Sequence, residues 1–163
     1  MKTFINVIFL LTVSTKLLAA PKSKPSLCKV GESSVFNCQV KGKTVSICAS
    51  KSKDAQDKFM QYRFGSPSKL ELSIPEKGID GIKVGNLMYS GGGGEFLIFK
   101  NKDTEYVVFS RIMKGGEDSG VLIQKGSKKI AGLYCKPNAE IEMSMTEVEA
   151  YGVPTIENAD YEF

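Results

Sequence analysis

The sequence predicts a mainly all-β domain, and three observations support this. From residue 35 onward, runs rich in β-branched and aromatic residues recur about every 8–12 residues, with turn-forming residues between them. Residues 69–74 alternate between apolar and polar side chains, as a strand with one wet face does. Sixteen glycines supply turn positions. We expect an antiparallel meander of about nine short strands, forming a sandwich or a barrel, with a short C-terminal helix.

The expected strands follow one another along the chain. A hairpin with its turn at Lys41-Gly42 begins the series, and the segments with strand character are residues 35–40, 43–48, 59–64, 69–74, 82–89, 95–99, 104–109, 120–124 and 128–134. After them, Ser144 and Glu147 form a capping-box pattern that opens a short helix, and Gly152 and Pro154 end it.

Residues 1–20 have the pattern of a signal peptide. Lys2 gives a short positive start, residues 4–13 are mostly apolar, and Ala19-Ala20 offers a small-residue cleavage site. The apolar run is shorter than the roughly 20 residues of a membrane-spanning helix. We therefore expect a periplasmic or secreted protein with no stable membrane insertion after cleavage.

The mature chain divides by composition into three parts. An N-terminal segment (21–34) precedes the β domain (35–135), and an acidic C-terminal tail with the short helix follows (136–163). Loss of Lys2 and Lys16 with the signal lowers the formal net charge from +4 to +2. This near-neutral balance does not favour nucleic-acid binding.

The four cysteines of the mature chain predict two disulfides, because exported proteins meet an oxidising compartment. Their spacing contains no C-x-x-C pair and the chain has no His, so a metal site is not expected. Three pairings are possible, and we favour Cys28–Cys48 with Cys38–Cys135. A turn at Lys41-Gly42 puts Cys38 on the core face, where a strand from the far end of the domain could meet it.

Two glycine-containing loops are the candidate binding sites. The first comprises Ser90, Gly91, Gly92, Gly93 and Gly94, and the second runs from Lys114 through Glu117, Asp118, Ser119 and Gly120. The first lacks the Lys-Ser/Thr and the helix of a phosphate loop, and the second lacks a calcium-loop pattern. Both could also serve simply as turns.

Arg63 is a third candidate. On a strand over residues 59–64, Tyr62 and Phe64 share one face, which we expect to be the core. Arg63 points to the other face and is left for recognition of a partner, for which arginine is a common anchor.

The absence of His removes imidazole-based catalysis and His-ligated metals. We expect a protein that is not an enzyme and has no cofactor. Two alternatives remain open, namely a structural envelope protein and a carboxylate-based hydrolase that uses two of Glu71, Glu95, Glu105, Glu117 and Asp118.

Five segments between Cys28 and Tyr134 carry a resemblance to known proteins, namely residues 35–38, 42–49, 61–65, 87–94 and 106–110. In these segments the chain resembles a group of small exported bacterial proteins of unknown function, which implies a Gram-negative periplasmic or secreted protein. It is also similar to the periplasmic lysozyme inhibitors, which use a Ser-Gly-x-x-Tyr loop to block the lysozyme cleft. The loops at Ser90 and Ser119 share the Ser-Gly pair and lack the Tyr.

Together these expectations describe an exported, non-enzymatic binding protein. The resemblance implies an inhibitor, or an immunity protein, against a cell-wall-degrading hydrolase. The expected partner is therefore a protein, such as a lysozyme-like or other peptidoglycan hydrolase.

Overall fold

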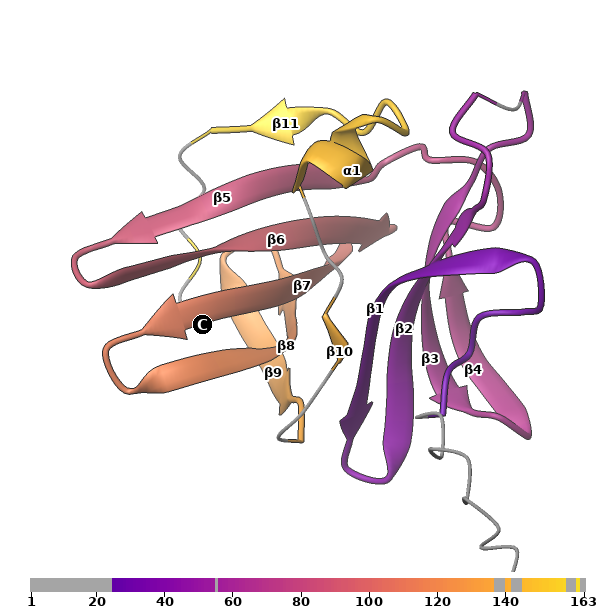
Figure 1. Cartoon of the computed structure of the whole chain (residues 1–163). Helices are drawn as coiled ribbons and strands as arrows, with labels where there is room; N and C mark the ends of the chain where they lie inside the picture. The colour runs from indigo at the N-terminus through magenta and orange to yellow at the C-terminus, as the bar shows by residue number, and fades with distance from the viewer. Residues whose placement is uncertain (1–24, 55, 137–139, 142–144, 158–160, 162–163) are drawn as a thin grey trace, which may run out of the picture.

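The fold is described from a computed structural model, shown in Figure 1. It describes residues 25–163 except 55, 137–139, 142–144, 158–160 and 162–163. The expected signal peptide at residues 1–20 lies outside the described residues.

Two sheets make up the fold, as the strand pattern predicted. The first has the order β10-β1-β2-β3-β4, with bounds β1 Glu32–Val40, β2 Lys43–Ser50, β3 Met60–Ser66, β4 Lys69–Ile74 and β10 Glu140–Ile141. The second has the order β11-β5-β6-β7-β8-β9, with bounds β5 Lys83–Tyr89, β6 Gly92–Asn101, β7 Thr104–Met113, β8 Gly116–Lys125, β9 Lys128–Tyr134 and β11 Thr155–Ile156. The pairs are antiparallel apart from β11 with β5. The nine main strands form two sheets and no closed barrel. Of the two architectures that the sequence left open, the structure therefore has packed sheets and not a barrel.

The main core lies between the two sheets, whose strands cross at a steep angle in Figure 1. Alternate residues of each strand enter it, because side chains on a strand point to opposite faces in turn. Phe36 and Tyr62 come from the first sheet and Leu97, Phe99 and Val108 from the second, all of them buried. This confirms the expected core position of Tyr62, and Phe64 packs against the same cluster.

A second apolar cluster lies on the other face of the second sheet. Its members are Leu87, Phe96, Ile98, Val107, Phe109 and Leu122. Ile156 and Tyr161 pack against this face, and Tyr161 lies edge-on to Phe96 with ring centroids 5.1 Å apart. The burial of Tyr161, together with the charge of Glu105, raises the pKa of its phenol to about 12.

The described residues after 135 pack against the two sheets, whereas the sequence pattern suggested a separate tail there. Helix α1 (Met145–Glu149) places Val148 in the main core, and Tyr151 and Val153 follow it. The Tyr151 hydroxyl donates a hydrogen bond to the carbonyl of Ser50 at 2.7 Å. Ser144, the expected cap, lies outside the described residues. No helix in the described part of the chain is long and apolar enough to cross a membrane.

Both disulfides form in the pairing that we favoured, Cys28 with Cys48 and Cys38 with Cys135. The turn at Lys41-Gly42 has positive φ at both residues, as a type I′ hairpin turn requires. It sets Cys38 opposite Val45 and leaves it buried at the core. The chain after β9 reaches Cys38 there, since the amide of Lys136 donates a hydrogen bond to the carbonyl of Gln39.

Candidate functional site

The two glycine-containing segments are tight turns and strand ends, which corrects the expectation of loops. In the first, Ser90 and Gly91 form the turn, and Gly92–Gly94 are the start of β6. In the second, Lys114 and Gly115 form the turn, and Gly116–Gly120 are the start of β8. The strands are longer than the alternation indicated, because glycine in a paired strand looks the same in sequence as glycine in a loop.

Both turns lie at the same end of the second sheet. Gly93 of β6 pairs with Ile112 of β7, and Met113 pairs with Gly116 across the next turn. Figure 1 shows the β5–β6 and β7–β8 hairpins projecting side by side, away from the first sheet. The structure therefore brings together two segments that are about 20 residues apart in the chain. We call the projecting part of these four strands the hairpin end.

An open hollow of about 640 Å³ lies at the hairpin end. Six of its lining residues lie on the face that the second sheet turns toward the first, because they alternate in phase with Val84, Leu97 and Val108 of the main core. These six are Asn86, Met88, Gly93, Glu95, Ser110 and Ile112. The hollow therefore lies on the inner face of the second sheet, beyond the part of that face that the first sheet covers.

Gly93 forms the floor of the hollow. Its neighbours across the strands are Met88 and Ile112, whose side chains stand on either side of it. A Cβ atom on Gly93 would lie 2.9 Å from the carbonyl oxygen of Leu87, so the position accepts no side chain without a shift of the strand. Met88 is 90% exposed and Ile112 is 60% exposed, which makes this an apolar pair open to solvent.

The opposite face of the hairpin end is held by an ion pair between neighbouring strands. Arg111 of β7 donates hydrogen bonds to both carboxylate oxygens of Asp118 on β8, at 2.5 and 2.9 Å. The Arg111 guanidinium also lies 5.4 Å from the centre of the Phe109 ring. Its hydrogen bonds to Asp118 raise the pKa of Arg111, and the nearby Tyr89 and Tyr134 raise it further. This arrangement stiffens the end of the β7–β8 hairpin.

The remaining predicted residues lie beside these groups. Glu117 is exposed and pairs in register with Ile112, while Ser119 is 7% exposed and pairs with Ser110. Gly120 is buried, between Phe109 and Tyr134 in the register. Nine of the ten proposed site residues therefore gather at one end of the second sheet. The tenth is Arg63, which lies in the first sheet.

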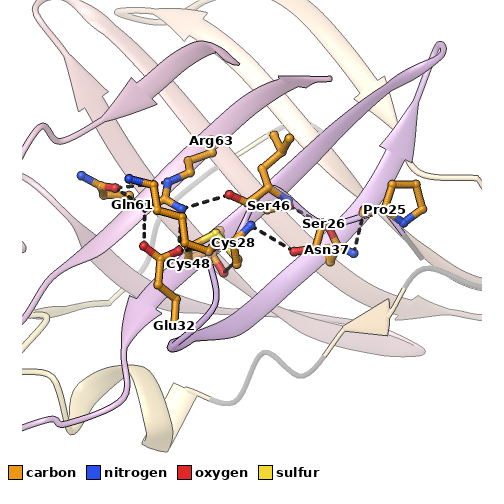
Figure 2. Close-up of a disulfide and its surroundings, with 12 residues drawn as sticks. Pro25, Ser26, Cys28, Glu32, Asn37, Ser46, Cys48, Gln61 and Arg63 are labelled. Atoms are coloured by element: carbon orange, nitrogen blue, oxygen red, sulfur yellow. Dashed lines mark hydrogen bonds and ion pairs between the residues drawn. A yellow bond between two sulfur atoms is a disulfide. The ribbon is translucent and has the colours of Figure 1, made fainter. Parts of the chain in front are cut away.

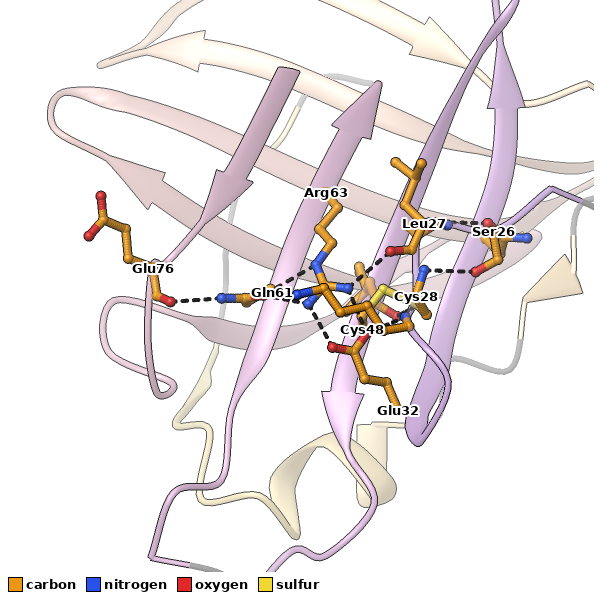
Figure 3. A network of polar contacts seen from close by, with 12 residues as sticks. Ser26, Leu27, Cys28, Glu32, Cys48, Gln61, Arg63 and Glu76 are labelled. Carbon is orange, nitrogen blue, oxygen red and sulfur yellow. Dashed lines mark hydrogen bonds and ion pairs between the residues drawn. A yellow bond between two sulfur atoms is a disulfide. The ribbon is translucent and has the colours of Figure 1, made fainter. Parts of the chain in front are cut away.

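Arg63 does not point outward for a partner, which corrects our expectation. It is 4% exposed, and its guanidinium donates hydrogen bonds to the Glu32 carboxylate, the Leu27 carbonyl and the Gln61 side chain (Figure 3). Burial raises the pKa of the Glu32 carboxyl, but the hydrogen bonds from Arg63 and Lys29 and their charges outweigh it and leave that pKa below its ordinary value. Strand alternation correctly placed Arg63 away from the main core, but the chain before β1 folds back and covers it.

This covering segment is fixed by polar contacts and by the first disulfide (Figure 2). The amide of Leu27 donates to the Ser46 hydroxyl, and Asn37 donates to the Pro25 carbonyl. Ligand atoms of Cys28, Glu32 and Cys48 lie within 4.8 Å of one another. Because the two sulfur atoms are bonded to each other, they are not thiolates and do not form a metal site.

The sequence analysis did not identify Met88, Arg111 and Ile112 as parts of the site, and it named Glu95 only as a candidate carboxylate of the hydrolase alternative. For Arg111 the sequence did contain a signal. A two-residue turn at Lys114-Gly115 places Arg111 opposite Asp118, and opposite charges across a hairpin stabilise it. No comparable signal marks Met88 and Ile112, because their exposure depends on where the first sheet ends.

No known protein family, curated protein or solved structure matches the chain. The resemblance to small exported bacterial proteins and to lysozyme inhibitors therefore stays a prediction, and the site must be interpreted from its own geometry.

Proposed function

We propose that this is an exported binding protein, without enzymatic activity, that docks on a partner protein through the hairpin end. The observation that carries the proposal is the exposure of Met88 and Ile112 on either side of an open hollow. Burial of one such side chain contributes about 1.5–3 kcal/mol, so a partner that covers both gains substantial affinity. The ion pair between Arg111 and Asp118 holds the hairpin in shape before binding, which lowers the entropic cost of association.

The partner that we propose is a peptidoglycan hydrolase, which this protein inhibits or neutralises as an immunity protein. Two features support this class. The two disulfides are compatible with an oxidising compartment outside the cytoplasm, where such hydrolases act. Glu95 and Glu117 add negative charge beside the exposed apolar pair, which suits a basic target.

The carboxylate-hydrolase alternative receives less support at this site. Hydrolysis by two carboxyl groups requires them about 5–10 Å apart around one substrate bond. Glu95 is the one carboxylate among the described residues that line the hollow. Asp118, on the opposite face, is bound by Arg111.

The test uses the oxidised mature protein with a panel of purified peptidoglycan hydrolases that includes a lysozyme. Clearing of a peptidoglycan suspension is followed with and without the protein. We expect inhibition of at least one hydrolase, and we expect the double variant Met88→Ser/Ile112→Ser to inhibit at least tenfold less well. Leu70→Ser is the matched control, because Leu70 is also exposed, at 51%, but lies on the first sheet.

Three outcomes would contradict the proposal. If no hydrolase is inhibited, the inhibitor assignment is wrong. If the double variant and the Leu70→Ser control inhibit equally well, the hairpin end is not the docking surface. If the protein alone clears the suspension, the hydrolase alternative replaces the proposal.

A further inference from the structure

Glu95 is a half-buried carboxylate inside the hollow, and it has no hydrogen-bond or ion-pair partner among the described residues. Three other carboxylates of the second sheet and its turns are engaged, and Glu117 of β8 is exposed to solvent rather than half-buried. Asp118 is bound by Arg111, Asp103 by Lys125, and Glu105 accepts a hydrogen bond from Gln124. A partly buried charge without a counter-ion is costly, so Glu95 stands out from its neighbours.

The groups around Glu95 on the same face are neutral. Asn86 and Ser110 flank it in the register on β5 and β7. One row further toward the turns, Met88 and Ile112 stand on either side of Gly93. Arg111 also borders the hollow, but its guanidinium lies on the opposite face with Asp118. The hollow therefore combines an apolar entrance with a negative charge deeper along the sheet.

We propose that this hollow receives a lysine or arginine side chain of the partner protein. The inference rests on the proposed function and specifies the chemical class of the partner's side chain that enters the hollow. The aliphatic stem of such a side chain packs over Gly93 between Met88 and Ile112, as long basic side chains do on apolar surfaces. Its cationic head reaches the Glu95 carboxylate, and the side-chain oxygens of Asn86 and Ser110 accept its remaining hydrogen bonds.

Size and charge both fit this occupant. A volume of about 640 Å³ is ample for one extended basic side chain together with part of its backbone. The two apolar side chains shield the head group from water, which strengthens its attraction to Glu95. An acidic or purely apolar side chain would leave Glu95 repelled or unpaired.

The test is an NMR titration of the oxidised mature protein with three small probes. These are n-butylammonium, n-butylguanidinium and 1-butanol, which share an alkyl chain and differ in charge. We expect both cations to shift the amide signals of Gly93, Glu95 and Ile112, and to bind about tenfold more tightly than butanol. In Glu95→Gln this preference for the cations should disappear. In Glu105→Gln, a half-buried carboxylate on the same sheet, it should remain.

The outcomes separate this inference from the function it rests on. If butanol binds as tightly as the cations, or if Glu95→Gln keeps the preference for the cations, the inference of a basic side chain is wrong. Docking through Met88 and Ile112 is tested separately, by the inhibition assay. Sedimentation velocity at several protein concentrations checks a second copy as occupant. A dimer that is lost in both Glu95→Gln and Lys114→Gln would mean that the Lys114 turn of another copy fills the hollow, which also overturns the inference.

Discussion

Arg63 and Glu32, which are 31 residues apart in the chain, form an ion pair with two hydrogen bonds, at 2.5 and 2.9 Å. Their side chains are only 5% and 12% exposed. Arg63 also donates a hydrogen bond to the carbonyl of Leu27, so this one side chain connects β3 to β1 and to the segment before β1. The pair therefore fixes the outer face of the first sheet.

Loss of Arg63 should destabilise the protein strongly. In Arg63→Met the Glu32 carboxylate is left buried without its partner, and we expect the free energy of unfolding to fall by about 3–5 kcal/mol. The double variant Glu32→Leu/Arg63→Met removes both charges and should recover most of this loss. Urea denaturation of the three proteins measures the effect, and a double variant less stable than Arg63→Met would contradict it.

The same pair should make stability depend on acid pH. Interaction with Arg63 keeps the pKa of Glu32 below its value of 4.5 in an unfolded chain. Its contribution is therefore complete above about pH 5 and is lost as the pH falls through the lower, folded-state pKa. We expect the unfolding free energy of Glu32→Gln to change less between about pH 5 and pH 2 than that of the wild type. Equal slopes would show that Glu32 does not contribute.

The strand position of the glycine run can be tested with two alanine substitutions. In Gly94→Ala the new Cβ would lie 2.1 Å from the carbonyl oxygen of Ser110, whereas a Cβ on Gly115 has no atom within 4 Å. We expect Gly94→Ala to cost about 1–3 kcal/mol. For Gly115→Ala we expect a change within about 0.5 kcal/mol. If thermal or urea unfolding shows both variants to be equally stable, Gly94 does not lie in a paired strand.

The two disulfides should contribute unequally to stability. The bond between Cys38 and Cys135 spans 97 residues and that between Cys28 and Cys48 spans 20. Loop entropy predicts about 4.7 kcal/mol for the longer loop and about 3.3 kcal/mol for the shorter one. Unfolding of Cys38→Ala/Cys135→Ala and Cys28→Ala/Cys48→Ala measures both. Thiol labelling of the unfolded, unreduced wild type should find no free cysteine, and labelled residues would contradict the presence of two disulfides.

Local pattern predicted the main strands and the presence of two disulfides, and it favoured one of the three possible pairings, which the structure has. The turn at Lys41-Gly42 and the alternation around it put Cys38 and Phe36 on one face, and that face proved to be the core. Side-chain direction along a strand depends on near neighbours in the chain, so sequence carries it directly. Where glycines interrupted the alternation of apolar and polar residues, as in residues 90–94 and 114–120, the prediction started the strands too late.

The tertiary structure decided which outward-facing residues are exposed and which are covered. Alternation placed Arg63 away from the core, but the segment ending at Cys28 folds back over it and buries it against Glu32. Met88 and Ile112 lie on the core-facing side of the second sheet and are nevertheless exposed, because the hairpins extend past the first sheet. Both results depend on contacts between distant parts of the chain, and no local sequence pattern records where one sheet stops covering another.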